Sequence, residues 1–106
     1  PRVTSRTEVT VENLLGLNPF TSTSSSAVIT VLEPSHGRST SDTVRFRNVS
    51  SFDGFTSTIL EKAAGYSITK VNDDTYTFSA SSGTATTGEV RGGGGRVTAG
   101  PVTLGT

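Results

Sequence analysis

The apolar runs of this sequence are short, and turn-forming residues end each of them. Residues 27–32 form a β-branched run typical of a buried strand, and Pro34 and Gly37 follow it as turn residues. Val44 and Phe46 alternate with two arginines, so the apolar pair and the basic pair are expected on opposite faces of one strand. Apolar runs this short are too brief for a buried helix, a coiled coil or a membrane-spanning helix. The sequence therefore predicts short strands joined by turns.

Two further alternating runs flank an Asn-Asp-Asp turn. Residues 66–71 and 75–80 are separated by residues 72–74, and short polar turns of this kind are typical of β-hairpins. On the second run, the side chains of Tyr76 and Phe78 are expected to face the same way.

One short helix is expected between the strands. Thr58 stands three residues before Glu61, which fits a capping box, and Gly65 supplies a stop after two alanines. This pattern favours one or two helical turns near residues 58–64.

Several short strands with turn chemistry between them predict an all-β domain. We expect a small antiparallel β-barrel or sandwich with one short helical turn and extended terminal arms. The predicted division is an N-terminal extended arm at 1–26, a core at 27–93 and a C-terminal strand or arm at 94–106. Within the first arm, residues 8–12 alternate like one anchoring strand. The predicted core is centred on Ile29, Val31, Val44, Phe46, Ile68, Tyr76 and Phe78.

Composition and charge argue against several classes of function. Nine basic and nine acidic residues balance, so no overall field would gather nucleic acid or an anionic membrane. The chain has no Cys, which excludes a thiolate nucleophile and Cys-ligated zinc. His36 is the only imidazole and is expected to cap a turn beside Gly37. Residues 72–74 carry oxygen ligands but lack the spacing of an EF-hand loop. We expect no enzyme activity, no cofactor, no metal and no small-molecule substrate.

Four residues are candidates for surface or partner contacts: Arg45, Arg47, Phe52 and Phe55. The two arginines share a strand face, which favours a solvated or subunit-contacting surface. Arg91 and Arg96 flank a run of four glycines, which is expected to permit a close backbone approach or a bulge. An RNA-binding barrel using the four arginines would show steep salt dependence. Glu89 stands close to the glycine-flanking arginines, which argues against nucleic acid.

A series of short motifs resembles a module of known phage proteins. The motifs follow one order, at residues 18–23 (NPFTST), 26–31 (SAVITV), 36–37 (HG), 42–46 (DTVRF), 53–55 (DGF), 65–71 (GYSITKV), 76–78 (YTF) and 92–95 (GGGG). Over most of residues 18–97 the chain resembles the β-rich module of tail nozzle (tail tubular protein B-like) proteins of short-tailed bacteriophages and related phage virion structural proteins. It departs from that pattern at Ser41, where the family usually has Gly, and at residues 46–48.

The resemblance implies a structural role in the virion, as a β module of an oligomeric tail assembly without catalytic residues. The expected partners are other phage virion proteins and further copies of the chain in a ring-shaped assembly. The arms and sheet edges would bind neighbouring subunits by adding strands to their sheets. Removing residues 1–25 should then abolish assembly and leave the core folded.

The alternative function is a glycan-binding or adhesin-type module on a virion or bacterial surface. Such a module needs exposed aromatic rings to stack on sugars. Phe20, Phe52 and Phe55 are the candidates, because the chain has no Trp. Phe52 and Phe55, on either side of Asp53-Gly54, are the best such pair, but loop aromatics of this kind more often plug the end of a barrel.

Overall fold

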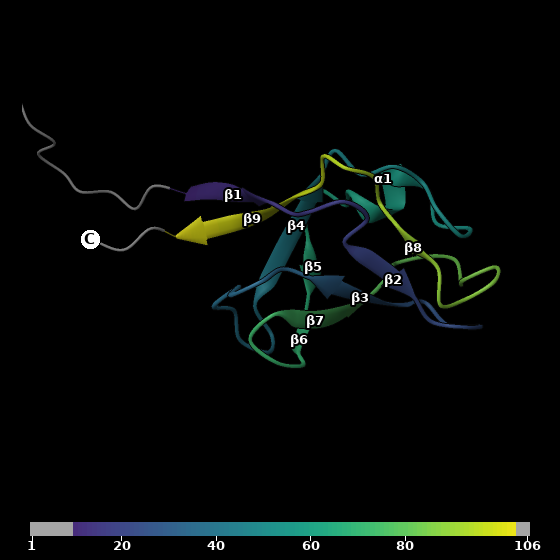
Figure 1. The fold of residues 1–106 in the computed structure, drawn as a ribbon, viewed down its shortest axis with the longest axis horizontal. Helices are drawn as coiled ribbons and strands as arrows, with labels where there is room; N and C mark the ends of the chain where they lie inside the picture. The colour runs from purple at the N-terminus through teal and green to yellow at the C-terminus, as the bar shows by residue number, and fades with distance from the viewer. Residues whose placement is uncertain (1–9, 104–106) are drawn as a thin grey trace, which may run out of the picture.

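The structure, a computed structural model, describes the backbone of residues 10–103 and the side chains of residues 14–100. Over this part of the chain, short strands build two antiparallel sheets, and one short helix accompanies them (Figure 1). The elements are β1 (Thr10–Leu14), β2 (Phe20–Ser22), β3 (Val28–Leu32), β4 (Thr43–Arg47), α1 (Ser57–Leu60), β5 (Tyr66–Ser67), β6 (Thr69–Lys70), β7 (Thr75–Ser79), β8 (Arg91–Gly92) and β9 (Thr98–Thr103).

The two sheets form a sandwich and do not close into a barrel over the described residues. A four-stranded sheet has the order β1-β9-β4-β5, and a five-stranded sheet has the order β6-β7-β3-β2-β8. The all-β prediction is confirmed, and the sandwich is the architecture that forms. Strand pairing is antiparallel throughout both sheets, because hairpins and longer returns, rather than helical crossovers, connect the strands.

Aromatic rings fill the space between the sheets. Phe46, on β4, meets Phe20 of β2 with ring centroids 5.0 Å apart and Phe78 of β7 at 5.1 Å. Every predicted core residue is at most 3% exposed, which confirms the alternation of strands β3, β4 and β7. Burial of these side chains supplies the main stabilisation of the sandwich.

The Asn-Asp-Asp turn connects two paired strands, as predicted. Lys70 on β6 pairs with Tyr76 on β7 across this turn. The run expected as one strand at residues 66–71 is divided between the sheets, because β5 pairs with β4 whereas β6 pairs with β7. Ile68 lies between the two short strands and is only 1% exposed, so the chain crosses from one sheet to the other through the core.

The predicted helix forms, but its capping box does not. Thr56 is the N-cap, and its hydroxyl accepts a hydrogen bond from the backbone N–H of Ile59 at 3.3 Å. The Glu61 carboxylate instead accepts from the backbone N–H of Val49 at 2.8 Å. The prediction that Thr58 caps the helix is wrong, because the helix begins at Ser57. The Glu61 carboxylate, the other half of the predicted capping box, is hydrogen-bonded to Val49.

Residues assigned to the two arms include interior strands of the sandwich. β2 lies between β3 and β8, and β9 lies between β1 and β4. Phe20 and Val97 are fully buried, so both segments contribute to the core. Removing residues 1–25 would delete β2 and Phe20, and the remaining chain could not keep the core intact. Residues 1–9 and 104–106, the outer parts of the predicted arms, lie outside the described residues.

β1 and the second half of β9 continue beyond the sandwich as a two-stranded ribbon (Figure 1). Thr10 pairs with Thr103 and Val11 with Val102, whereas the pairing of β9 with β4 ends at Gly100. The ribbon is the part of the described chain that corresponds best to the expected extended ends.

Candidate functional site

Arg45 and Arg47 lie on the outer face of the four-stranded sheet. Their neighbours on β4, Val44 and Phe46, are fully buried, so the arginines occupy the opposite face, as the alternation predicts. Arg45 pairs across the sheet with Gly100, which has no side chain, and is half-buried. Its Nε atom is buried without a hydrogen-bond partner among the described residues. A buried donor of this kind is uncommon in proteins.

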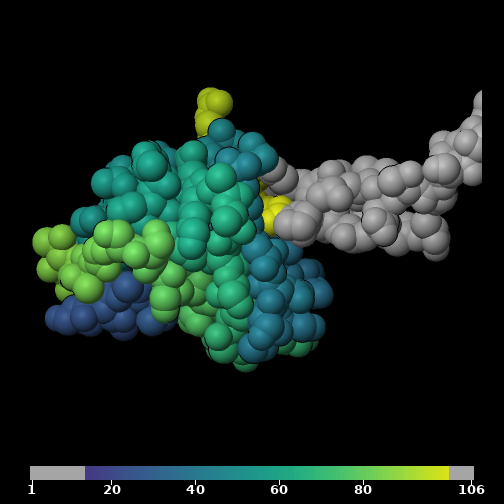
Figure 2. Space-filling view, turned by 180° about the vertical axis from the view of Figure 1, so that it is seen from behind, coloured from purple at the N-terminus to yellow at the C-terminus, as the bar shows by residue number. Residues whose placement is uncertain are grey.

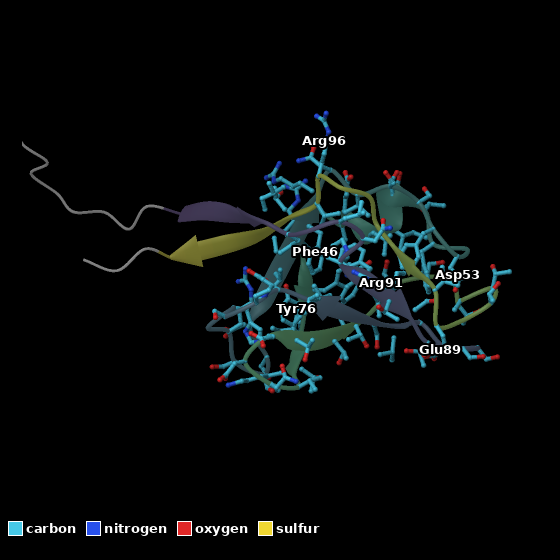
Figure 3. The ribbon with its side chains drawn as sticks, in the orientation of Figure 1. Phe46, Asp53, Tyr76, Glu89, Arg91 and Arg96 are labelled. Atoms are coloured by element: carbon cyan, nitrogen blue, oxygen red, sulfur yellow. The ribbon has the colours of Figure 1, made fainter. Side chains whose placement is uncertain are left out.

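A third arginine and two leucines extend this face. Thr98 of β9 pairs with Arg47 on one side and with Leu14 on the other. Leu14 is 70% exposed, and Arg96 precedes the buried Val97 and points away from the body of the domain (Figure 3). Leu17 is 69% exposed and lies close to Gly95, beside Arg96. Local sequence pattern does not reveal these leucines, because Leu14 comes near Arg47 only through the pairing of β1 and β4 with β9, and Leu17 comes near Arg96 only through the fold.

Arg91 does not belong to this surface. It lies on β8 in the other sheet, and its Nη2 atom donates to the carbonyl oxygens of Leu17 at 3.2 Å and Asn18 at 3.1 Å. The four arginines named for the RNA-binding alternative therefore divide into an outer-face group and one residue that fastens a loop.

Phe52 and Phe55 close one end of the sandwich instead of presenting a surface. The two residues bridge each other through paired backbone hydrogen bonds, and Phe55 is 1% exposed. The Phe52 ring stacks on the Phe20 ring, with the two ring centroids 6.2 Å apart. All five Phe and both Tyr of the chain lie in the described part, and all of them except Phe52 are at most 5% exposed. Both rings therefore make core contacts at this end, in agreement with the interpretation that they plug it, and the Phe52 side chain stays partly exposed.

The glycine run permits the close approach expected from the sequence. A Cβ at Gly92 would lie 2.3 Å from Cγ of Phe52, and one at Gly93 would lie 2.9 Å from the Phe20 ring. Gly93 also has a φ of +105°, which L side chains rarely adopt. Glycine at these positions allows the aromatic rings to pack directly against the backbone.

Asp53 links three separate segments at the same end. Its carboxylate accepts from the Ser22 hydroxyl at 2.6 Å and from the backbone N–H groups of Thr87 at 2.8 Å and Gly88 at 2.9 Å. Figure 2 shows the loop before β8, in light green, lying against the blue segment that follows β2. The hydrogen bond from Ser22, and to a smaller extent those from the backbone N–H groups, hold the pKa of Asp53 below its ordinary value. The network fixes a loop against β2.

A buried charged cluster closes the other end. Arg38 donates from Nε to Glu33 Oε1 at 3.0 Å and from Nη2 to Oε2 at 3.1 Å, and the Tyr76 hydroxyl donates to Oε1 at 2.6 Å. Burial, together with the adjacent Glu33 carboxylate, raises the pKa of the Tyr76 hydroxyl. Burial alone would lower the pKa of Arg38, but its bond and attraction to Glu33 raise it. The sequence analysis did not identify this ion pair.

His36 caps a turn, as predicted. Its Nδ1 atom accepts from the backbone N–H of Arg38 at 2.8 Å, so Nε2 carries the proton and donates to the Asn72 carbonyl at 2.7 Å. Both ring nitrogens bind the backbone, and the ring is 7% exposed. This geometry suits a structural role and leaves no nitrogen available as a general base.

Residues 14–100 contain no group of three or more His, Asp or Glu side chains placed to hold a metal ion. Among the described helical residues, no segment is long and apolar enough to cross a membrane.

Comparisons with known proteins give a likeness of fold alone. No family model matches the chain, and no curated protein sequence matches it. Among solved structures, the fold is similar to part of the phage phi92 endosialidase, with a TM-score of 0.59 and 20% sequence identity. The similarity covers 92% of this chain and 13% of that protein, so the chain spans about an eighth of the length of its structural neighbour.

Proposed function

We propose that this chain is a structural β module of a bacteriophage virion, located in the tail and bound to neighbouring virion subunits. The observation that carries the proposal is the likeness of nearly the whole sandwich to a segment of a phage enzyme. The order of motifs that resembles tail nozzle modules supports the same class of protein, and a nozzle-type position is the finer form of this proposal.

The proposed role is non-catalytic. The neighbouring protein is an endosialidase, but the similar part is only 13% of it, so its activity need not belong to this segment. In this chain the single His binds backbone groups through both nitrogens, and Asp53 binds a buried Ser and two backbone N–H groups. These contacts hold loops in place, which suits a load-bearing module better than a hydrolase.

The packing of the aromatic residues counts against the alternative of a glycan-binding module. Phe20 and Phe55 are at most 1% exposed, and Phe52 is held between Phe20 and Gly92. A sugar-binding platform needs an accessible ring face.

Immunogold electron microscopy of purified particles tests the proposal. Antibody raised against the chain should label the tails of intact virions, and antibody pre-absorbed with the purified chain should not. A chain that is made during infection but absent from purified particles would contradict a virion role. Label confined to the capsid would contradict the tail position.

A further inference from the structure

The large exposed apolar side chains of the described residues fall into two pairs: one lies beside arginines, and the other lies beside two aspartates and Lys70. Leu14 and Leu17 are 70% and 69% exposed, and Leu32 and Val71 are 43% and 58% exposed. Contiguous apolar side chains at a surface, bordered by polar groups, are typical of protein contact sites.

The first surface, which we name the arginine–leucine face, consists of Leu14, Leu17, Arg45, Arg47 and Arg96. These residues lie on or beside the outer side of the four-stranded sheet, across β1, β9 and β4. The other outward positions whose side chains the structure describes on β4, β5 and β9 are Thr43, Ser67, Thr98 and Gly100, and none is acidic. Among the side chains that the structure describes, the charged residues of this face are all basic, and two leucines accompany them.

The second surface, which we name the aspartate–valine face, consists of Leu32, Val71, Asp73 and Asp74. Leu32 pairs with Thr75, whose carbonyl accepts from the backbone N–H of Val71, so the two apolar residues flank one strand on the outer side of the five-stranded sheet. The side chain of Asp73 is 91% exposed and lies 3.4 Å from the Lys70 ammonium. Asp74 binds the backbone N–H of Ser35 and is also exposed.

The two faces point in opposite directions. The inner sides of the two sheets share the aromatic core, through Phe46 on one sheet and Phe20 and Phe78 on the other. The outer sides are therefore on opposite surfaces of the sandwich. The two faces of a single copy therefore cannot contact each other.

We propose that the arginine–leucine face of one copy binds the aspartate–valine face of a second copy, in a head-to-tail contact. The proposal deepens the proposed function, because it names a further copy of this chain as the neighbouring subunit. Charge complementarity supports this occupant: each face carries the charges and the apolar pair that the other lacks.

A head-to-tail contact of this kind leaves one unused face on each end of a dimer. Further copies can therefore add, and they form a ring if the rotation between copies closes or a filament if it does not. A nucleic acid is the less suitable occupant of the arginine–leucine face, because the two exposed leucines would gain nothing against phosphates, and exposed rings for base stacking are absent from the described residues.

Two variants, one for each face, test the contact. R47E/R96E reverses the charge of the first face at two exposed positions, and V71S/D73K changes the second face at two exposed positions. In sedimentation velocity, the unaltered chain should associate as its concentration rises, and each variant should associate roughly tenfold or more weakly. Lys62→Glu and Glu89→Lys, which change charges on neither face, should leave association unchanged. Circular dichroism confirms that each variant is folded.

The decisive experiment mixes the two variants. Each variant retains the face that the other has lost, so an equimolar mixture should associate although neither variant associates strongly alone. The inference is overturned if the unaltered chain stays monomeric at its highest soluble concentration, if the variants associate as it does, or if the mixture forms no dimer. A monomeric chain that still labels virion tails would overturn this contact and leave the proposed function intact. A chain that associates as described but is absent from virions would overturn the proposed function alone.

Discussion

The two ends of the sandwich are closed by opposite physical means. At one end, the Phe52–Phe55 bridge covers the core, and Gly92 lies directly against the Phe52 ring. At the other end, Glu33 and Arg38 form a buried ion pair whose carboxylate also binds the Tyr76 hydroxyl. Figure 3 places Asp53 and Tyr76, one from each closure, toward different ends of the domain.

The difference separates two kinds of sensitivity. The aromatic end depends on shape, because a single added carbon at Gly92 meets an aromatic ring. The charged end depends on pairing, because a buried charge without its partner is strongly unfavourable. Substitutions that change volume should therefore affect the first end most, and substitutions that change charge should affect the second.

The largest effect is expected at the charged end. Arg38→Met should lower the free energy of unfolding by about 3–5 kcal/mol, because the Glu33 carboxylate stays buried without its guanidinium partner. Urea denaturation followed by circular dichroism measures this loss. The double variant Glu33→Met with Arg38→Met should recover much of it, since no unpaired charge remains. A double variant as unstable as the single one would show that volume rather than charge matters at this end.

A smaller loss is expected at the aromatic end. Gly92→Ala should cost about 1–3 kcal/mol, because the new Cβ overlaps Phe52. Gly16→Ala is the matched control, since a Cβ there meets no atom within 4 Å. In a Phe52→Ala background, Gly92→Ala should lose most of its effect. Equal effects with and without the Phe52 ring would refute the steric account of this closure.

A weaker effect is expected at the helix that follows the aromatic closure. Thr56→Ala should destabilise the protein by about 1 kcal/mol, because the N–H of Ile59 loses its cap. Thr58→Ala should change little, since Thr58 is exposed and does not cap the helix. Thermal unfolding of the two variants compares the positions directly. A larger loss at Thr58 would favour the capping box predicted from the sequence.

The smallest effect concerns pH at the aromatic end. Because the pKa of Asp53 is lowered in the folded protein, its contribution to stability is complete above the ordinary pKa of 3.8. That contribution should disappear as the pH falls from 3.8 through the folded-state pKa. Asp53→Asn should therefore flatten the loss of stability in this acid range and lower stability at neutral pH. Unfolding midpoints measured from pH 7 down to acid conditions test this, and unchanged acid dependence in the variant would contradict it.

Local pattern was sufficient for the parts of the fold in which neighbours in sequence are neighbours in space. The alternation at Val44 and Phe46 predicted a buried face, and the Asn-Asp-Asp turn predicted the pairing of β6 with β7. His36 beside Gly37 predicted a turn cap. Each of these features depends on side-chain direction or turn chemistry within a few residues.

Distant pairings account for what the sequence did not reveal. Phe20 pairs with Gly92, and Leu14 and Arg47 meet through Thr98, so no local period reports either contact. The partner of Glu33 is only five residues away, but a Glu after a strand is usually solvated. Here the Tyr76 hydroxyl donates to Glu33, and Arg38 donates to the Ala99 carbonyl, so residues from distant strands complete the cluster. The arginines were identified, whereas the leucines beside them required the three-dimensional structure.

The pairing of Thr10 with Thr103 also determines how the module would respond to tension. Force that separates β1 from β9 at those residues would load their cross-strand hydrogen bonds one pair at a time, as in a zipper, since the bonds lie perpendicular to the strands. The ribbon would open before β9 is torn from β4, and the aromatic interior would be reached last. Such a force would therefore lengthen the β1–β9 ribbon stepwise while the sandwich stays folded.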